Sequence, residues 1–332
     1  MSGRLRVLSA GPGETIQDAG RYGYLRYGVV ASGPMDWIAY EILNRALENP
    51  RDAAAIEISR AGIAVACEAA PLVVAFGGGG FIWERSGARL STAGIVRLEP
   101  GEHLRARAGS SWGNWTYLAI AGGIDVPRVL GSRSTYARFA IGGIEGRALR
   151  AGDALAACAS DAQPQTGALL TPLLERPKGS IRVVLGPQDD YFTDEARATF
   201  FTQAYTISTR FDRMGYWLEG PRITHSGGFD IVSDGIPLGA IQVPGAGQPL
   251  VLMADHQATG GYPKLGTVAR ADIGAFAQHR PGENVRFEAC TVDAARRALL
   301  DVYASLERPL SRASDEALAS SNLIGGVISA TD

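Results

Sequence analysis

Short apolar runs, each bounded by glycine or proline, follow one another along this chain and recur in the same order in its two halves. The recurring strings are RYGY at 21–24 and RMGY at 213–216, AIE at 55–57 and AIQ at 240–242, LVVA at 72–75 and LVLMA at 250–254, and PGEHLRARA from Pro100 and PGENVRFEA from Pro281. Self-similarity at a near-constant spacing is typical of repeated structural units. The shared order predicts two homologous lobes, at 1–160 and 181–290, joined by a linker at 161–180.

The runs have the composition of β-strands. Glycine accounts for 42 of the 332 residues, against a usual share of about 7 %. Because glycine inside a strand or helix costs about 0.5–1 kcal/mol relative to alanine, so many glycines favour a turn-rich β fold. The strands we expect are RLRVLSA, AAIEI, IAVAC, LVVAF, TYLAIAG, IRVVLG, FDIVS, AIQV and PLVLMA.

Helical patterns are fewer, and the clearest runs over 36–48. Apolar residues recur there at helical spacing, and Asn49-Pro50 supplies a stop signal. Further helices are expected near 193–201, 271–279 and 292–306. The prediction is a mainly β protein with some α, a C-terminal helix at 291–307 and a mobile tail at 308–332.

Composition excludes several classes of protein. A formal net charge of -2 gives no basic field for nucleic acid. The apolar stretch 55–76 contains Glu57, Arg60 and Glu68, so it does not read as a membrane span. Three widely spaced cysteines, an odd number, and four scattered histidines indicate neither a disulfide framework nor a metal site. With no apolar signal segment at the start, these features predict a cytoplasmic protein.

The densest polar region, 233–266, holds one set of candidate site residues. The apolar run PLVLMA ends on Asp255, His256 and Gln257, and a glycine turn then leads to Tyr262 and Lys264. Polar loops at strand ends commonly carry sites. Only two of the 32 basic residues are lysines, so a lysine here indicates either a specific need for a compact ammonium or an ordinary surface residue.

The corresponding region of the first half is TIQDAGRYGYLRYGVVASGPMD, with Gln17, Asp18, Arg21, Ser32 and Asp36. Ser32 or Asp36 suits the N-cap of the following helix, and the same helix start also offers free N–H groups to an anion or oxyanion. Two other strings stay open. FGGGG at 76–80 lacks the Lys and Ser/Thr of a triphosphate loop and favours a structural turn, and VLGSRSTYARF suits either an anion site or an inter-lobe turn.

These strings together resemble the allophanate hydrolase subunit 2 group, also called the 5-oxoprolinase C-type subunit or biotin-dependent carboxyltransferase family. The resemblance rests on TIQDAGRYGY with SGPMD, YLAIAGGIDVP with VLGSRSTY, RVVLGPQDDYF, DRMGYWLEG, GAIQVPGAGQPLVLMAD, TGGYPKL and AQHRPGENVRF. Relatives often carry Arg and Thr where this chain has His256 and Ala258, Arg at Trp217, and a T-G-A turn where FGGGG stands. These departures bear on the substrate rather than on the fold.

The resemblance implies two cyclophilin-like β-barrel lobes and a partner, a B-type subunit of the allophanate hydrolase subunit 1 type. It implies a subunit of a 5-oxoprolinase that opens 5-oxoproline to glutamate with ATP, beside a third subunit. One alternative is a module that transfers carboxylate from carboxybiotin, on a separate carrier, to urea or a similar amide. Another is a non-catalytic protein that binds and antagonises its B-type partner. ATP is expected at the level of the complex, and no metal.

The expected site residues fall into two groups. Those expected to act in catalysis are Lys264, Asp255, Arg21, Arg213 and Asp18. Those expected to bind substrate are Gln17, Ser32, Asp36, Gln242, His256, Gln257 and Tyr262. Within this hypothesis the two arginines hold a substrate carboxylate, Lys264 stabilises charge on the carbonyl oxygen, and Asp255 moves protons or orients Lys264.

Overall fold

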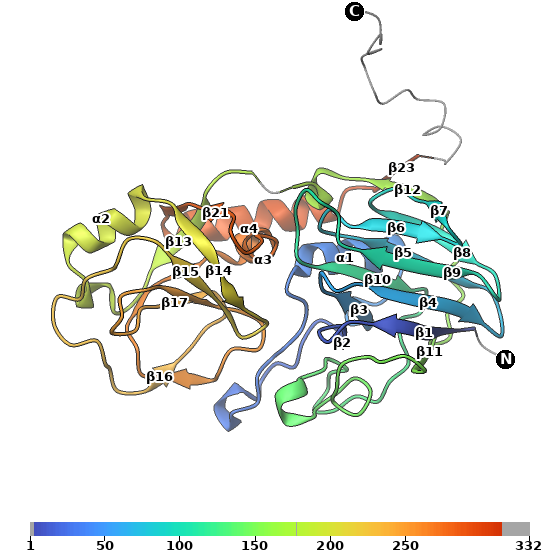
Figure 1. The fold of residues 1–332 in the computed structure, drawn as a ribbon, viewed down its shortest axis with the longest axis horizontal. Coiled ribbons are helices and arrows are strands. Elements are labelled where there is room, and N and C mark those ends of the chain that lie inside the picture. The colour runs from blue at the N-terminus through green and yellow to red at the C-terminus, as the bar shows by residue number, and fades with distance from the viewer. Residues whose placement is uncertain (1–2, 177, 314–332) are drawn as a thin grey trace, which may run out of the picture.

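The structure, a computed structural model, describes residues 3–176 and 178–313. Two β lobes lie side by side in Figure 1, the first at the right and the second at the left, with helices α3 and α4 at the junction between them. Most of the chain in both lobes is strand and turn. The architecture is therefore mainly β with some α, as the sequence predicts.

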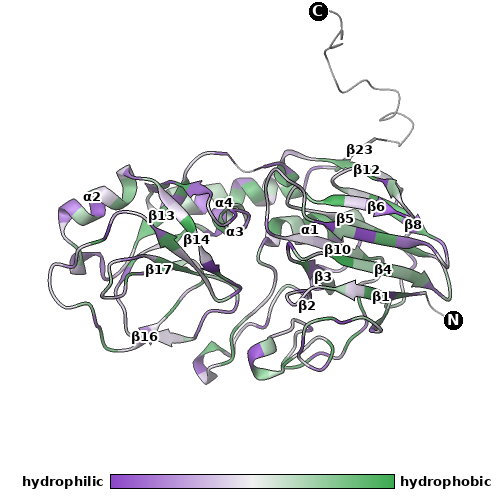
Figure 2. Cartoon of the chain, in the orientation of Figure 1, coloured by the Kyte–Doolittle hydropathy of each residue, from purple (hydrophilic) through white to green (hydrophobic). Residues whose placement is uncertain are grey.

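Two antiparallel sheets form the first lobe. The six-stranded sheet runs in the order β11 (Ala154–Ala156), β1 (Arg4–Ala10), β4 (Ile63–Glu68), β9 (His103–Arg107), β6 (Ile82–Arg85) and β7 (Ala88–Arg89). The seven-stranded sheet runs in the order β2 (Thr15–Gln17), β3 (Ala55–Ile58), β10 (Thr116–Ile120), β5 (Leu72–Gly77), β8 (Gly94–Leu98), β12 (Gly167–Leu170) and β23 (Ser311–Ala313). Leucine, isoleucine, valine and phenylalanine side chains fill the space between these sheets, and Figure 2 shows the hydrophobic stretches on their strands.

A single eight-stranded sheet forms the second lobe. Its order is β21 (Asn284–Val285), β14 (Tyr205–Phe211), β15 (Gly215–Glu219), β18 (Leu250–Leu252), β17 (Ala240–Gln242), β20 (Lys264–Val268), β13 (Ile181–Leu185) and β22 (Phe287–Ala289). The pairing of β13 with β22 is parallel, whereas the other pairings are antiparallel. A separate two-stranded ribbon joins β16 (Asp234–Gly235) to β19 (Thr259–Gly260).

The four α-helices of the described residues lie where the sequence patterns predict them. They are α1 (Trp37–Ala46), α2 (Asp194–Thr202), α3 (Ile273–Ala277) and α4 (Val292–Leu306). Side chains of Asp36, Thr193 and Thr291 cap α1, α2 and α4 by accepting a hydrogen bond from a backbone N–H three residues on. Short 3-10 helices complete the chain at Leu25–Tyr27, Ala137–Phe139, Pro172–Leu174, Asp189–Tyr191 and Arg270–Asp272.

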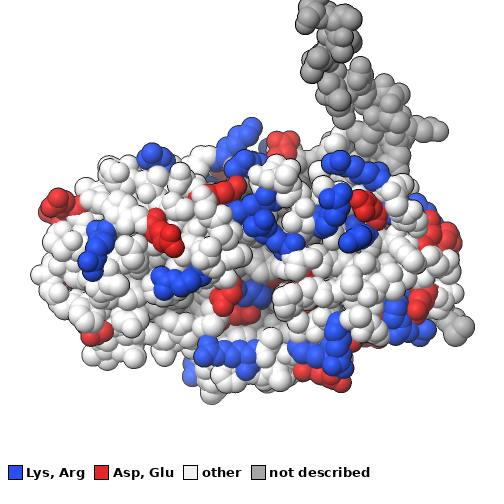
Figure 3. Space-filling model, viewed as in Figure 1, with Lys and Arg blue, Asp and Glu red and all other residues white. Residues whose placement is uncertain are grey.

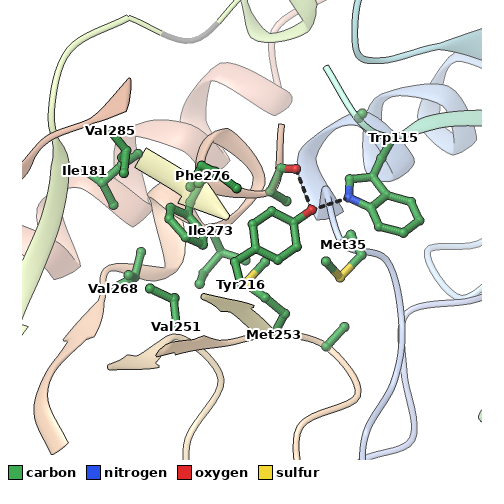
Figure 4. Packing of buried hydrophobic residues seen from close by; sticks show 14 of the residues in the cluster. Met35, Trp115, Ile181, Tyr216, Val251, Met253, Val268, Ile273, Phe276 and Val285 are labelled. Atoms are coloured by element: carbon green, nitrogen blue, oxygen red, sulfur yellow. Dashed lines mark hydrogen bonds between the residues drawn. The ribbon is translucent and has the colours of Figure 1, made fainter. Parts of the chain in front are cut away.

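One hydrophobic cluster contains residues of both lobes, beside the cluster that lies between the sheets of the first lobe. Helix α1 packs on β10 and contacts α3 of the other lobe. At the junction, the Trp115 indole N–H donates to the Tyr216 hydroxyl at 2.8 Å, and that hydroxyl donates to the Ala277 carbonyl at 2.9 Å, as drawn in Figure 4. The Gln278 side chain accepts from two backbone N–H groups of the first lobe, those of Asn114 and Trp115. The junction is thus packed and hydrogen-bonded, although the buried Asn114 Oδ1 has no partner among the described residues.

Three expectations differ from the structure. FDIVS at 229–233 forms no strand, because this segment runs over the surface and Val232 is almost wholly exposed. The stretch 161–180 contains β12, which pairs with β8, so it is more than a linker. Ser311–Ala313 forms β23 beside β12, so the described start of the expected tail is ordered in the sheet. The rest of that tail, 314–332, lies outside the described residues.

The internal repeat is visible in part. AIE and AIQ fall on β3 and β17, two buried strands that each pair with a later strand of their lobe, β10 and β20. RYGY lies in a loop before a 3-10 helix, whereas RMGY leads into β15. Arg21 and Arg213 therefore stand in different local structures. Within 3–176 and 178–313, no helix has the length and apolar character needed to cross a membrane.

Candidate active site between the lobes

Arg213 joins the two lobes through two carboxylates. Its Nε and Nη2 donate to the two carboxylate oxygens of Asp255, at 2.8 and 3.0 Å, within the second lobe. Its Nη1 donates to Glu57 on β3 of the first lobe, and Nη2 also donates to the Gly33 carbonyl at 2.8 Å. A guanidinium presents its donors in a rigid planar fork, which suits this two-sided arrangement. The cluster Glu57–Arg213–Asp255 is the electrostatic centre of the junction.

Glu57 is wholly buried, and the fold surrounds it with donors. Its Oε2 accepts from the Tyr117 hydroxyl at 2.7 Å and from the Met35 N–H at 2.8 Å. Burial raises the pKa of Glu57, and the nearby Arg213 charge opposes that rise. Burial also raises the pKa of Tyr117 far above its usual range, so its hydroxyl stays a donor. Register places the two together, because Tyr117 on β10 pairs with Glu57 on β3.

A cavity of about 520 Å³ opens beside this cluster. Its lining comes from both lobes: Pro12, Gly13, Thr15, Ser59, Arg60, Ala61, Asn114, Trp115, Tyr136, Ala137, Arg138, Ala148, Phe211, Asp212, Arg213, Met214 and Asp255. Arg60 and Arg138 add exposed cations at its rim, and Arg213 and Asp255 reach it from the interior. Figure 3 shows positive and negative side chains interspersed on one face of the molecule rather than a field of one sign. Most of the lining is apolar and a few charged side chains reach it, which suits a small ligand that carries a limited number of polar groups.

Asp18 organises the 132–134 loop of the first lobe. Its Oδ1 accepts from the hydroxyls of Ser132 and Ser134, at 2.6 and 2.7 Å, and its Oδ2 accepts from the Arg133 N–H. Asp18 is buried, and these bonds occupy both of its oxygens. The VLGSRSTY string therefore builds a turn around this carboxylate.

Arg21 lies next to the same loop. Its Nε and Nη2 donate to the carbonyls of Val129 and Ser134, and its Nη1 is buried without a partner among the described residues. Burial lowers the pKa of this guanidinium. Arg21 thus keeps one unpaired N–H donor among the described residues. Arg213 lines the cavity and Arg21 does not, so the two arginines do not face the same ligand position there.

The remaining first-lobe candidates support the backbone. The Gln17 side chain bonds Thr15, the Thr135 carbonyl and the Gly33 N–H. Asp36 caps α1 and accepts from Gln278 across the lobe junction at 2.9 Å, and burial raises its pKa. Ser32 has a positive φ of 53° and a buried hydroxyl without a partner among the described residues.

Lys264 lies elsewhere, in the second lobe. Its ammonium is buried and pairs with Asp234 at 2.8 Å, so the carboxylate that orients it is Asp234 and not Asp255. Gln242, its register partner on β17, is buried beside it. The structure therefore separates the two residues that the sequence analysis pairs.

The other second-lobe candidates take three different positions. His256 is buried, burial lowers its pKa, and its Nδ1 lies 2.8 Å from the Gln257 carbonyl. Gln257 lines a neighbouring cavity of about 380 Å³ that also contains Trp217. Tyr262 is largely exposed.

The FGGGG turn is held by close backbone packing. A Cβ on Gly79 would lie 2.5 Å from the Trp115 carbonyl oxygen, and one on Gly109 would lie 2.0 Å from the Gly80 carbonyl oxygen. The glycines are needed because segment 109–115 passes so close. Without Lys or Ser/Thr in the turn, these residues do not fit a triphosphate, and no step with ATP is assigned to this chain.

Sequence reasoning gave no role to Glu57, Arg138, Tyr136 or Trp115. One signal was available for Glu57, since a carboxyl group between isoleucines in the buried strand AIEI needs hydrogen-bond donors or a cation beside it. No local pattern marks the others, because YARF at 136–139 reads as a surface loop. Their placement depends on the contact between the lobes.

Residues 27–289 match the carboxyltransferase domain, subdomain A and B, and the chain belongs to this family. Among its relatives, the C-type subunit of 5-oxoprolinase from Escherichia coli strain K12 is 33 % identical over 302 residues, spanning 90 % of this chain and 94 % of that protein. The C-type subunit of 5-oxoprolinase from Haemophilus influenzae is also 33 % identical, over 88 % of this chain and 93 % of that protein.

Solved structures with a similar fold support this family assignment. The chain matches the Kluyveromyces lactis urea amidolyase with a TM-score of 0.85 at 29 % identity, covering 95 % of this chain and 20 % of that one. It matches TTHA0988 with a TM-score of 0.77 at 32 % identity, covering 86 % of this chain and 56 % of that one. The chain thus spans about a fifth of the first structure and about half of the second.

Proposed function

We propose that this chain is the C-type subunit of a 5-oxoprolinase, which opens the lactam of 5-oxoproline to glutamate at the expense of ATP. The observation that carries the proposal is an inter-lobe cavity with a buried Arg213–Asp255 pair and exposed arginines at its rim. Relatives with this printed name match it over nearly the whole of both chains. The partners are a B-type subunit and a third subunit, and the unpaired cysteines fit a cytoplasmic location.

The cavity offers complementary groups for both ends of such a substrate. 5-Oxoproline carries one carboxylate and one neutral lactam N–H and C=O. Arg138, exposed at the rim, is placed to bind the carboxylate, which a guanidinium recognises with two parallel hydrogen bonds. Asp255 reaches the same cavity, and its carboxylate can accept the lactam N–H.

Arg213 has a positioning role in this scheme. It binds both oxygens of Asp255 and is itself held by Glu57 and the Gly33 carbonyl of the other lobe. The orientation of the Asp255 carboxylate thus depends on the lobe junction. A carboxylate that is held by two hydrogen bonds from one guanidinium has a fixed orientation, so Asp255 orients the lactam.

The overall reaction breaks the lactam C–N bond. Water adds its hydroxyl to the carbonyl carbon and a proton to the nitrogen, while a second water hydrolyses ATP to ADP and phosphate. Because FGGGG does not fit a triphosphate, we assign the ATP site to the other subunits of the complex. This chain then binds and orients the lactam.

The test is reconstitution. The chain is co-expressed with candidates for its B-type and third subunits, and ATP-dependent glutamate release from 5-oxoproline is measured. Release that requires all three supports the proposal. Asp255→Asn should lower kcat/KM, and Arg138→Ala should raise KM, whereas Arg45→Ala, an exposed arginine on α1 away from the cavity, should change neither. A folded complex without release contradicts the proposal.

A second function has its own observation. The family description is that of a carboxyltransferase domain, and the TM-score of 0.85 is to a urea amidolyase. Under this alternative, carboxybiotin on a separate carrier protein delivers carboxylate to an amide substrate in the same cavity. Transfer of labelled carboxylate from carboxybiotin to urea, with no glutamate release, would favour it. Tight binding of the B-type partner without either activity would favour a regulatory protein.

A further inference from the structure

Lys264 is a buried cation whose counter-ion, among the described residues, is an exposed carboxylate. Its side chain is only 3 % exposed, and its ammonium has one carboxylate partner among the described residues, Asp234 at 2.8 Å. A desolvated ammonium requires an anion, because its charge loses most of its hydration. The anion is Asp234, which lies on the β16–β19 ribbon outside the eight-stranded sheet.

Asp234, in contrast, faces solvent. Its side chain is 53 % exposed, and it lies on β16, at the end of the exposed segment 226–235. Figure 1 shows β16 at the lower edge of the second lobe, away from the main sheet. A carboxylate in this position regains its hydration at little cost when it leaves the ammonium.

A second donor is left unused at the same place. Gln242 is 1 % exposed, and its Nε2 has no hydrogen-bond partner among the described residues. It is the register partner of Lys264 across β17 and β20. Its Nε2 also lies 2.6 Å from where a Cβ on Gly260 would be, and Gly260 pairs with Asp234 in the β16–β19 ribbon. The orphan donor therefore lies beneath the ribbon that carries Asp234.

The Gln188 side chain completes the arrangement. Its Nε2 lies 3.4 Å from an Asp234 oxygen, and its Oε1 lies 3.4 Å from the Lys264 backbone nitrogen. Both contacts are long, so Gln188 follows the ion pair rather than fixing it. Lys264 and Gln242 thus form a buried donor pair whose acceptor is carried on a surface ribbon.

We infer that Lys264 and Gln242 form a binding site for a small carboxylate anion, and that Asp234 occupies it as an internal carboxylate which the ligand displaces. A bound carboxylate offers two oxygens, one for the ammonium and one for the free amide N–H of Gln242. Asp234 leaves that amide unpaired. The ligand therefore satisfies one more buried donor than Asp234 does, which offsets part of the entropy lost on binding.

This site does not depend on the proposed function. Any small carboxylate has the required chemistry, including the carboxylate of 5-oxoproline. Acetate and 5-oxoproline are therefore both used as probes, and uncharged 2-pyrrolidinone controls for binding through the lactam alone. Failure of the oxoprolinase reaction would leave the acetate result unchanged.

The experiment is a titration of the full chain with sodium acetate at constant ionic strength, followed by the backbone amide NMR signals of Leu265 and Gly266. Asp234→Asn removes the internal anion but keeps the acceptor for the Gly235 N–H. It should bind acetate at least tenfold more tightly than the unsubstituted chain. Asp230→Asn, an exposed aspartate on the same segment, is the matched control and should bind like the unsubstituted chain.

Two further variants locate the site. On the Asp234→Asn background, Lys264→Met should abolish the gain, and Gln242→Leu should reduce it several-fold. Circular dichroism shows whether each variant is folded. If Lys264→Met does not fold, Gln242→Leu still tests the site. No gain in Asp234→Asn, or an equal gain in Asp230→Asn, overturns the inference, as does a gain that survives Gln242→Leu.

Discussion

The AIE and AIQ strands place two different residues at the same point of the repeat, and the cations beside them are paired differently. In the first lobe Glu57 supplies a wholly buried carboxylate to Arg213, which also binds Asp255. In the second lobe Gln242 supplies only an amide, so Lys264 takes its counter-ion from exposed Asp234. The two pairs differ because Glu57 is a carboxylate on a buried strand, whereas Gln242 is uncharged. The Glu57–Arg213 pair is therefore held inside the molecule, and the Lys264–Asp234 pair can open to solvent.

The charges of the Glu57–Arg213–Asp255 cluster maintain the fold, whereas Asp234 is free to leave Lys264. Removing one member of a buried pair leaves an unpaired buried charge, and this is costly. Removing a member whose partner is exposed leaves a charge that water solvates. Variants at the two cations therefore test the contrast directly.

The largest effect is expected for Arg213→Met, which leaves Glu57 and Asp255 without their cation. We expect the free energy of unfolding to fall by about 3–5 kcal/mol, measured by urea denaturation. Arg97→Met, which breaks a pair that is 53 % exposed on both sides, should cost less than about 1 kcal/mol. Equal losses in the two variants would remove the contrast.

Asp18→Asn should give the next largest loss. Both oxygens of Asp18 accept from a backbone N–H, that of Gly20 at Oδ1 and that of Arg133 at Oδ2, so an amide nitrogen at either position faces a fixed donor. A buried donor left without an acceptor costs about 1–3 kcal/mol. Thermal denaturation of this variant is compared with that of Asp52→Asn, whose partner Arg128 is exposed. A smaller loss for Asp18→Asn than for Asp52→Asn would contradict the role we give to this loop.

Lys264→Met should cost less than about 1 kcal/mol, even though the lysine is as buried as the core. Methionine keeps most of the apolar stem, and Asp234 regains water. The measurement is the same urea denaturation as for Arg213→Met. A loss as large as that of the arginine variant would mean that the Lys264–Asp234 pair is locked.

The smallest effect is a change in pH dependence at His279, at the lobe junction. Burial lowers the pKa of its imidazole below the ordinary value of 6.5. As the pH falls, the imidazole is protonated in the unfolded chain before it is protonated in the folded chain. The contribution of His279 to stability is therefore full above about pH 6.5 and is lost as the pH falls. His279→Gln should flatten the fall in stability between about pH 6.5 and 5. His103→Gln, at an exposed position, should leave the slope unchanged.

Much of the fold follows from local patterns. The periodicity at 36–48 and 292–306 predicts α1 and α4 nearly to the residue, since capping residues and stop signals act within one turn. FDIVS misled because its alternation suits a strand, but this segment runs over the surface and pairs with no strand of the described chain. Strand propensity is realised only where a partner strand is available.

The sequence analysis named only some of the residues that meet between the lobes. The sequence singled out Asp255 and Lys264 because they lie in a polar, glycine-rich region, and it singled out Arg213 because RMGY repeats the RYGY of the first half. It paired Asp255 with Lys264, which are near in sequence, and omitted Glu57 and Arg138. Residue type was therefore easier to predict than the partner of each residue.

The sequence by itself determined the family, the β-rich class, the helices with their caps, and the residues rich in chemistry. Only the tertiary structure decided which charges meet. Glu57 and Arg213 lie 156 positions apart, and Lys264 and Asp234 lie 30 apart on a surface ribbon. Caps and turns are set by backbone groups a few residues away, whereas burial and ion pairing depend on how two lobes and a ribbon pack, which no short pattern encodes.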